Sequence, residues 1–151
     1  MSLESTTSPT RPFLDWPVVT DPADWQADVA VLGIRHSEPY AHDTFPNDQS
    51  HAPDAIREKS QSFCYNPGHW DFDTQTELAA NLPPRHIDIG NVSWSGVGDY
   101  GAYSAAVSER VRHVWRQGAQ LFVLGGDHGV TIPVVDALDA VGEPVHILHI
   151  D

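Results

Sequence analysis

LFVLGGDHGVTIPVVDALDAVGEPVHILHID, residues 121–151, is the stretch of sequence that decides the fold. It opens with a short apolar run, 121–124, that stops at two glycines, as a buried strand of a parallel sheet does. A second apolar run, 145–150, is predicted to form another strand of that sheet. His128 and Asp151 would then both follow the carboxyl ends of strands, the edge at which open α/β sheets bind their ligands.

The rest of the sequence alternates between strand and helix patterns. Apolar runs predict strands at 28–34 and 86–90. Apolar side chains spaced by three and four residues predict a helix over 100–117, and a proline at a first helical position predicts another over 53–63. A further helix is expected over 130–138. Such alternation is typical of the α/β class, with a mainly parallel sheet and helices on both of its faces.

Two regions are expected along the chain. Residues 1–24 are rich in Ser, Thr and Pro and carry only scattered apolar groups, so they are predicted to form a flexible N-terminal arm. Trp16 and Trp25 are candidates for pinning this arm to the body or to a neighbouring subunit. Residues 25–151 are expected to form one α/β domain, because a chain of 151 residues can bury a sizeable core.

Composition excludes several classes of partner. The net charge of −13, with only eight Lys and Arg, disfavours binding to nucleic acid or to an anionic membrane and mildly favours a cationic substrate, although it also serves solubility. No apolar run is long enough to span a bilayer, and the N-terminus lacks a signal-peptide pattern. Cys64 is the only cysteine, which fits a reducing compartment. A soluble, cytoplasmic protein is therefore expected.

The strongest candidate for a ligand site is the loop Gly125-Gly126-Asp127-His128. Glycines at a strand end let the backbone turn sharply and leave room for an ion or ligand. A phosphate site is disfavoured because the sequence has neither Gly-x-Gly-x-x-Gly nor a P-loop lysine, and Asp127 would repel an anion. A metal site would use His128 as a nitrogen ligand together with nearby carboxylates. The structural alternative is that Asp127 caps the next helix and His128 is a satisfied, partly buried imidazole.

Asp151 bears on that choice. If it emerges beside His128, a cation would offset the cost of an unpaired carboxylate at an apolar strand end, and so would exposure to solvent. Three histidines in or beside the long loop after the first strand could also line the mouth of a site, but surface histidine is the expectation for each of them: His36, His42 and His51.

Several short motifs follow one another along the chain. The most specific are 124–128 (Leu-Gly-Gly-Asp-His), 131–133 (Thr-Ile-Pro) and 149–151 (His-Ile-Asp). Weaker motifs precede them at 28–33, at 52–57 (Ala-Pro-Asp-Ala-Ile-Arg) and at 88–92 (Asp-Ile-Gly-Asn-Val). In combination and in order, these motifs resemble those of the ureohydrolase family of arginases, agmatinases and related amidine hydrolases. The loop over 39–50 is more similar to the agmatinase and guanidine-hydrolase side of the family than to arginases.

The resemblance implies a three-layer α/β/α domain with two Mn²⁺ ions. It also implies hydrolysis of a guanidino or amidine C–N bond in a small cationic compound, agmatinase-like, with release of urea. Two metal ions would activate water at neutral pH. His128 is similar to the family's first-motif histidine, a ligand to one metal. Asp151 is similar to the first aspartate of the Asp-Ala-His-x-Asp motif, which bridges both ions. No catalytic or substrate-binding residue is assigned.

The departures from the family pattern are equally informative. Of six ligand positions, the 151 residues match two; the rest of the Asp-Ala-His-x-Asp motif and the downstream Asp-x-Asp motif are missing from the sequence. Gly129 stands where the family commonly has Ser, and Asn91 where it commonly has Asp. The expectation is therefore the N-terminal portion of a ureohydrolase domain, reaching to the strand that ends at Asp151, with a partial metal site and no activity by itself.

Two other functions are weighed against this one. The chain could be a non-catalytic assembly or regulatory subunit that pairs with a full-length relative, since a half sheet leaves an open edge for a partner. Homo-oligomerisation is the related expectation. A nucleotide-binding α/β module ranks last, because the phosphate-binding signals are missing.

Overall fold

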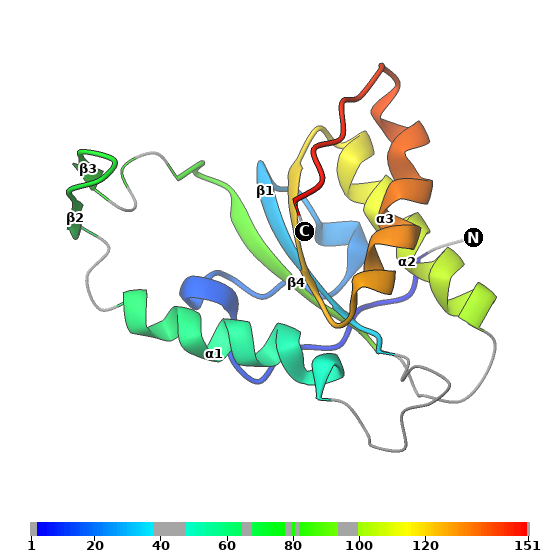
Figure 1. Ribbon diagram of the computed structural model, residues 1–151, viewed down its shortest axis with the longest axis horizontal. Helices are drawn as coiled ribbons and strands as arrows, with labels where there is room; N and C mark the ends of the chain where they lie inside the picture. The colour runs from blue at the N-terminus through cyan, green and yellow to red at the C-terminus, as the bar shows by residue number, and fades with distance from the viewer. Residues whose placement is uncertain are drawn as a thin grey trace.

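The computed structural model describes residues 3–37, 48–64, 68–77, 80, 82–93 and 100–150 (Figure 1). A three-stranded parallel sheet in the order β4-β1-β5 forms its centre. The strands are β1 (Val29–Arg35), β4 (His86–Ser93) and β5 (Gln120–Gly125), so each of these three predicted strands is confirmed. Because the strands are parallel, their carboxyl ends meet at one edge of the sheet.

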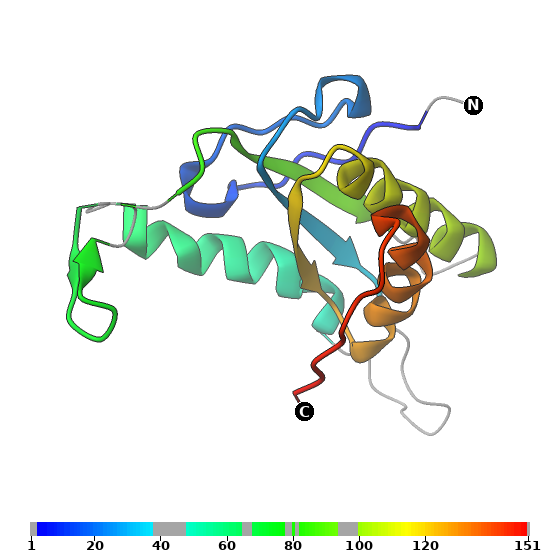
Figure 2. The same ribbon diagram turned by 90° about the horizontal axis from the view of Figure 1, so that it is seen from above.

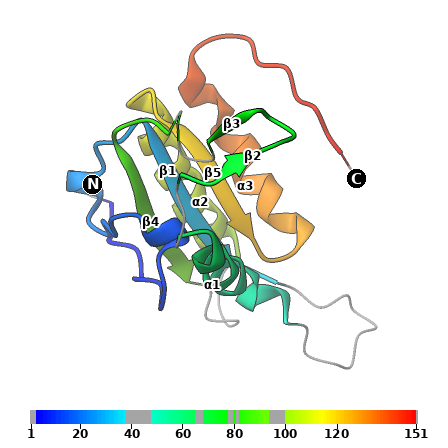
Figure 3. The same cartoon turned by 90° about the vertical axis from the view of Figure 1, so that its left-hand side faces the viewer.

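Helices cover both faces of this sheet. Helix α1 (Ala52–Cys64) lies on one face, while α2 (Tyr100–Arg116) and α3 (Thr131–Asp136) lie on the other (Figures 2 and 3). The three-layer α/β/α fold is thus confirmed. The helix expected over 130–138 is divided between α3 and two flanking 3₁₀ helices. The remaining short elements are η1 (Phe13–Asp15), η2 (Pro22–Asp24), η3 (Gln49–His51), η4 (His128–Val130), η5 (Ala137–Val141) and the hairpin β2 (Trp70–Asp71) and β3 (Thr76–Glu77).

The apolar core explains why β1 is the central strand. Val31, Leu32 and Ile34 have no exposed surface, so alternate residues of β1 are buried on both faces of the sheet. Val107 and Val111 of α2, spaced by one helical turn, are equally buried. The described residues contain no helix that is both long and apolar enough to cross a bilayer.

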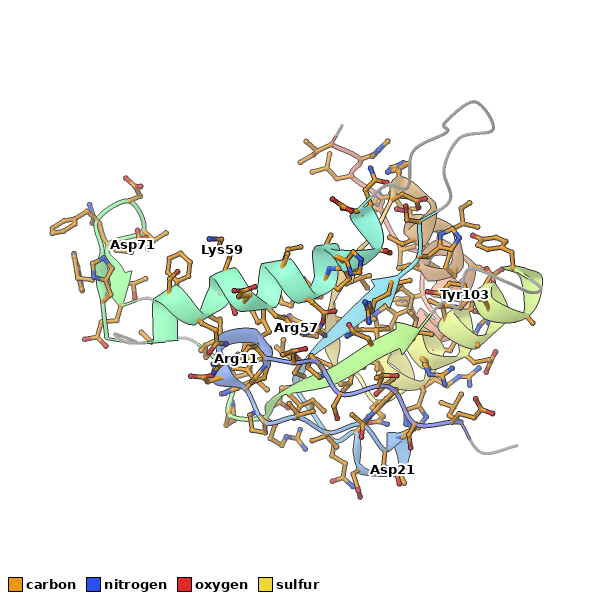
Figure 4. All side chains as sticks on the ribbon, turned by 90° about the horizontal axis from the view of Figure 1, so that it is seen from below. Arg11, Asp21, Arg57, Lys59, Asp71 and Tyr103 are labelled. Atoms are coloured by element: carbon orange, nitrogen blue, oxygen red, sulfur yellow. The ribbon has the colours of Figure 1, made fainter. Side chains whose placement is uncertain are left out.

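A buried ionic network ties α1 to β4. Arg57, whose side chain is fully buried, forms a two-point contact with Asp88 through Nε–Oδ2 (2.7 Å) and Nη2–Oδ1 (2.9 Å). Its Nη1 donates to Asn91 Oδ1 at 2.7 Å. A Cβ at Gly33 would lie 1.9 Å from that amide oxygen, so only glycine leaves room for the network here. Figure 4 shows Arg57 on the side of α1 that faces the sheet, and Lys59 on the opposite side.

The N-terminal segment lies along the outer edge of β4. The backbones of Thr7 and Asn91 exchange two hydrogen bonds of 2.9 and 2.8 Å, and Asp88 exchanges bonds with Pro17 and Val19. Trp16 is 5% exposed and Trp25 is 2% exposed, so both indoles pin this segment to the body. The flexibility of residues 1–24 stays a prediction, but the arm occupies one edge of the sheet.

The prediction of a strand over 145–150 is wrong, because these residues form no strand. These residues carry no strand pairing and stand away from the sheet (Figure 3). Ile147, Leu148 and Ile150 are 66%, 85% and 84% exposed. A run that is apolar throughout becomes a strand only when a ladder partner and cover on both faces are present, and the described residues supply neither at this position. The outer edge of β5 also has no ladder partner among the described residues.

Candidate functional site

The loop after β5 continues the pairing of β5 with β1 beyond the strands themselves. The amide of Gly126 donates to the carbonyl of Ile34 at 3.1 Å, and the amide of Asp127 donates to the carbonyl of His36 at 3.1 Å. A Cβ on Gly126 would lie 1.8 Å from the His36 carbonyl oxygen, so this approach requires glycine. The loop is therefore anchored to the backbone that leaves β1, at the carboxyl edge of the sheet.

Asp127 shapes the turn that follows. Its Oδ1 accepts a hydrogen bond from the amide of Gly129 at 2.9 Å and so caps η4. The capping function that the sequence left open for Asp127 is therefore observed. This hydrogen bond fixes the turn from Asp127 to Gly129, and His128 is the residue between the two.

His128 is the first residue of η4, and its side chain is exposed. The structural alternative for His128, a satisfied and partly buried imidazole, is not what the structure has. Its ring lies 5.3 Å from the ring of His149, with an angle of 24° between the planes. Both histidines border a hollow of about 610 Å³ lined by His128, Thr131, Ile147, Leu148, His149 and Ile150.

Asp151, the second predicted metal ligand, lies outside the described residues, so its placement beside His128 stays a prediction. His149, two residues before it, does reach His128. The described part of the chain holds no group of three or more His, Cys, Asp or Glu side chains that could bind a metal ion. An exposed imidazole at the carboxyl edge could occupy one position in the coordination sphere of a divalent cation.

His36 is the residue that the sequence-based expectation missed. Surface exposure was expected, but His36 is 4% exposed. Its ring lies 4.9 Å from that of Tyr100 and 5.7 Å from that of Tyr103, at the start of α2. Burial raises the pKa of the Tyr103 phenol, and the neighbouring Tyr100 and Asp127 add to the shift. Its place directly after a buried strand was the only signal in the sequence that His36 could be enclosed.

The other candidate histidines contribute less. His51 belongs to η3 and is exposed, as expected, with its Nδ1 3.4 Å from Arg35 Nη2. His42 lies outside the described residues. The carboxyl edge thus combines an exposed His128 with a buried His36 behind it, and Asp127 stands between them.

Comparison with known proteins agrees with this architecture. The model of the arginase family matches residues 27–151. An agmatinase from Chromobacterium violaceum is 31% identical over 126 residues, which cover 82% of this chain and 36% of that protein. The mitochondrial arginase 1 of Oryza sativa subsp. indica is 32% identical over 133 residues, with 83% and 36% covered. The chain thus spans little more than a third of the length of these curated relatives.

Solved structures give the same result. A hypothetical agmatinase from Burkholderia thailandensis superposes with a TM-score of 0.62 at 27% identity, covering 89% of this chain and 40% of that one. A formiminoglutamase from Trypanosoma cruzi, solved with Mn²⁺, shares the fold with a TM-score of 0.57 at 21% identity, covering 78% and 38%. Agmatinases are found in both comparisons, which supports the similarity to the agmatinase side. From the family match, the sequence identities and the shared fold together, the chain belongs to the arginase family.

Proposed function

We propose that this chain supplies part of the metal site of a manganese-dependent hydrolase that cleaves a guanidino or amidine C–N bond and releases urea. The observation that carries the proposal is the exposed imidazole of His128 at the carboxyl edge, on a turn fixed by Asp127, in a chain of the arginase family. His128 would bind one ion, and Asp151 would bridge the two. Bound divalent ions lower the pKa of water and supply a nucleophile at neutral pH.

Manganese is proposed for two reasons. A ligand set of carboxylates with a few imidazoles suits Mn²⁺ better than it suits the softer metals that thiolates select. The formiminoglutamase that shares this fold was solved with Mn²⁺. The net charge of −13 favours the approach of a small cationic guanidino compound such as agmatine. The proposed location is the cytoplasm.

The proposal is tested by titrating the 151-residue chain with MnCl₂. Paramagnetic broadening of the imidazole signals in NMR spectra reports even weak binding. We expect selective broadening of His128, lost in His128→Asn and weakened in Asp151→Asn. His146→Asn is the matched control, because His146 is also exposed, lies in the same C-terminal segment as Asp151 and has no proposed function. Equal broadening of all exposed histidines would contradict the proposed site.

Activity gives a second test. With only two ligand positions in its sequence, the isolated chain is expected to bind Mn²⁺ weakly and to release no urea from agmatine or arginine. A fusion of the chain to the remaining part of the Chromobacterium violaceum agmatinase would complete the ligand set and is expected to release urea only with Mn²⁺. Robust urea release by the isolated chain would contradict the idea of a partial site.

A second function, in assembly or regulation, is favoured by one specific feature. The outer edge of β5 has no ladder partner among the described residues, and Phe122 on this strand is 58% exposed. An open, apolar edge favours pairing with another copy or with a full-length relative. Size-exclusion chromatography of the chain, with and without a complete ureohydrolase, separates these outcomes, and elution as a monomer in both runs would argue against assembly.

A further inference from the structure

His36 is a buried side chain at the carboxyl edge of the sheet. It follows β1 directly and is 4% exposed. Its ring contacts Tyr100 and Tyr103 at the start of α2, the helix that follows β4. Its Nδ1 lies 3.6 Å from Oδ1 of Asp127, in the loop after β5. One imidazole that follows β1 therefore contacts both α2 and the loop after β5.

Asp127 passes these contacts on to the turn that carries His128. The same Oδ1 that faces the His36 imidazole accepts the amide hydrogen bond of Gly129 at 2.9 Å. A Cβ on Gly129 would lie 3.0 Å from Oδ1 of Asp127 and 3.9 Å from Nδ1 of His36, so both side chains lie close to this turn. The carboxylate that caps the turn around His128 is therefore in direct contact with the side chain at position 36.

We propose that His36 is a positioning residue, which acts through Asp127 to hold the His128 turn in the orientation in which it presents its imidazole to a divalent cation. Groups behind a metal ligand fix its direction, so that binding does not have to order the ligand as well. The part of this proposal that concerns a metal rests on the function proposed above. The ordering of the turn does not, because its contacts exist without any metal.

The chemistry of imidazole separates this function from simple packing. Phenylalanine at position 36 would fill the same space between the two tyrosine rings but would place no polar ring nitrogen opposite the Asp127 carboxylate. Glutamine would lose the ring contacts but would keep an N–H donor. Asp127→Ser would keep an oxygen that can cap η4 and would remove the carboxylate that faces His36.

The experiment measures two quantities in each variant of the 151-residue chain: the hydrogen-exchange rate of the Gly129 amide, and the dissociation constant for Mn²⁺ from broadening of the His128 signals. In His36→Phe we expect exchange about tenfold faster and an Mn²⁺ dissociation constant about 10–100-fold higher. His36→Gln should restore most of both. His113→Phe is the matched control, because the His113 ring also lies against an aromatic ring, that of Trp25 at 5.7 Å, and its Nε2 donates to the carbonyl oxygen of Pro22 at 3.0 Å.

The double variant His36→Phe with Asp127→Ser gives the sharpest result. If His36 acts through Asp127, the double variant should bind Mn²⁺ no more weakly than the weaker single variant. Additive losses would overturn the proposed pathway, as would Gly129 exchange and Mn²⁺ affinity in His36→Phe within twofold of those in the control. Should His36→Phe not fold, Asp127→Ser carries the test, and unchanged Mn²⁺ affinity in that variant overturns the proposal.

The two proposals fail in different ways. If the unmodified chain binds no Mn²⁺ at His128 but Gly129 exchange still accelerates in His36→Phe, the proposed metal function is wrong and the ordering of the turn by His36 stands. If the chain binds Mn²⁺ at His128 and neither quantity changes in His36→Phe, the metal site stands and the positioning function of His36 is wrong.

Discussion

Replacing Arg57 by methionine is expected to lower the free energy of unfolding by about 3–5 kcal/mol, because it would leave the Asp88 carboxylate buried without its cationic partner. Both side chains are fully buried, and Arg57 contacts both carboxylate oxygens of Asp88. Among the described residues, two backbone donors to that carboxylate would remain, the amides of Phe13 at 2.8 Å and Gly90 at 2.9 Å. Asn91 would lose a donor as well, which adds to the cost.

Urea unfolding followed by circular dichroism measures this loss directly. Thermal unfolding gives an independent value: for a domain of this size, about 2–4 °C per kcal/mol predicts a melting temperature lower by about 6–20 °C. Arg85→Met is the matched control, since Arg85 also pairs with an aspartate, Asp28, but with 62% of its side chain exposed. An exposed pair of this kind contributes little to stability, because solvent screens it.

A double variant distinguishes the ion pair from the packing around it. Arg57→Met combined with Asp88→Leu removes both charges and should recover most of the stability, because a buried pair replaced by apolar groups is often neutral in its effect. The reasoning is refuted if Arg57→Met costs no more than Arg85→Met, or if the double variant is less stable than Arg57→Met alone.

Three further changes give predictions of other kinds. Gly126→Ala should destabilise the fold by about 1–3 kcal/mol through overpacking, since its Cβ would lie 1.8 Å from a backbone oxygen. Gly68→Ala is the control: no atom lies within 4 Å of its Cβ, so this substitution should leave the melting temperature unchanged. The hydrogen bond from Arg112 holds the pKa of Asp139 below its usual value of 3.8. This contact therefore stabilises the protein above about pH 4, and the stabilisation is lost as the pH falls through the lowered pKa of Asp139. Asp139→Asn should flatten the decline of the melting temperature between about pH 5 and pH 2. An unchanged slope would contradict this expectation. Trp16→Ala should lower the free energy of unfolding by about 3–5 kcal/mol, because the indole is 5% exposed. It should also make residues 3–15 more sensitive to proteolysis. Equal rates of cleavage with and without the substitution would show that Trp16 does not hold the arm.

The sequence predicts the central sheet and its helices because their signals are local. The apolar runs that become β1, β4 and β5, and the three- and four-residue spacing that becomes α2, each lie within one element. The strand predicted at 145–150 fails for the complementary reason. Its composition indicates a strand buried on both faces, but a strand needs neighbours to pair with, and those are a property of the rest of the fold.

The candidate site divides in the same way. His128 could be identified because the Gly-Gly-Asp-His segment is contiguous and follows a strand end. The burial of His36 depends on tyrosines more than sixty residues away, and the burial of Arg57 depends on Asp88, so neither leaves a periodic signal nearby. A charged residue in a predicted helix is expected on the solvent side, and only the tertiary contacts show that Arg57 is turned inward.

The arm along β4 covers one of the two outer strands of the sheet, and this affects how copies of the chain could associate. With the backbone groups of Asp88 and Asn91 already paired to the arm, the open side of the sheet among the described residues is that of β5, and strands of a second copy would add there. Two molecules meeting through that side would satisfy each other and stop at a dimer with twofold symmetry. Removing residues 3–19 would leave each molecule with two unpaired strand edges, and head-to-tail association into filaments would then replace the closed dimer.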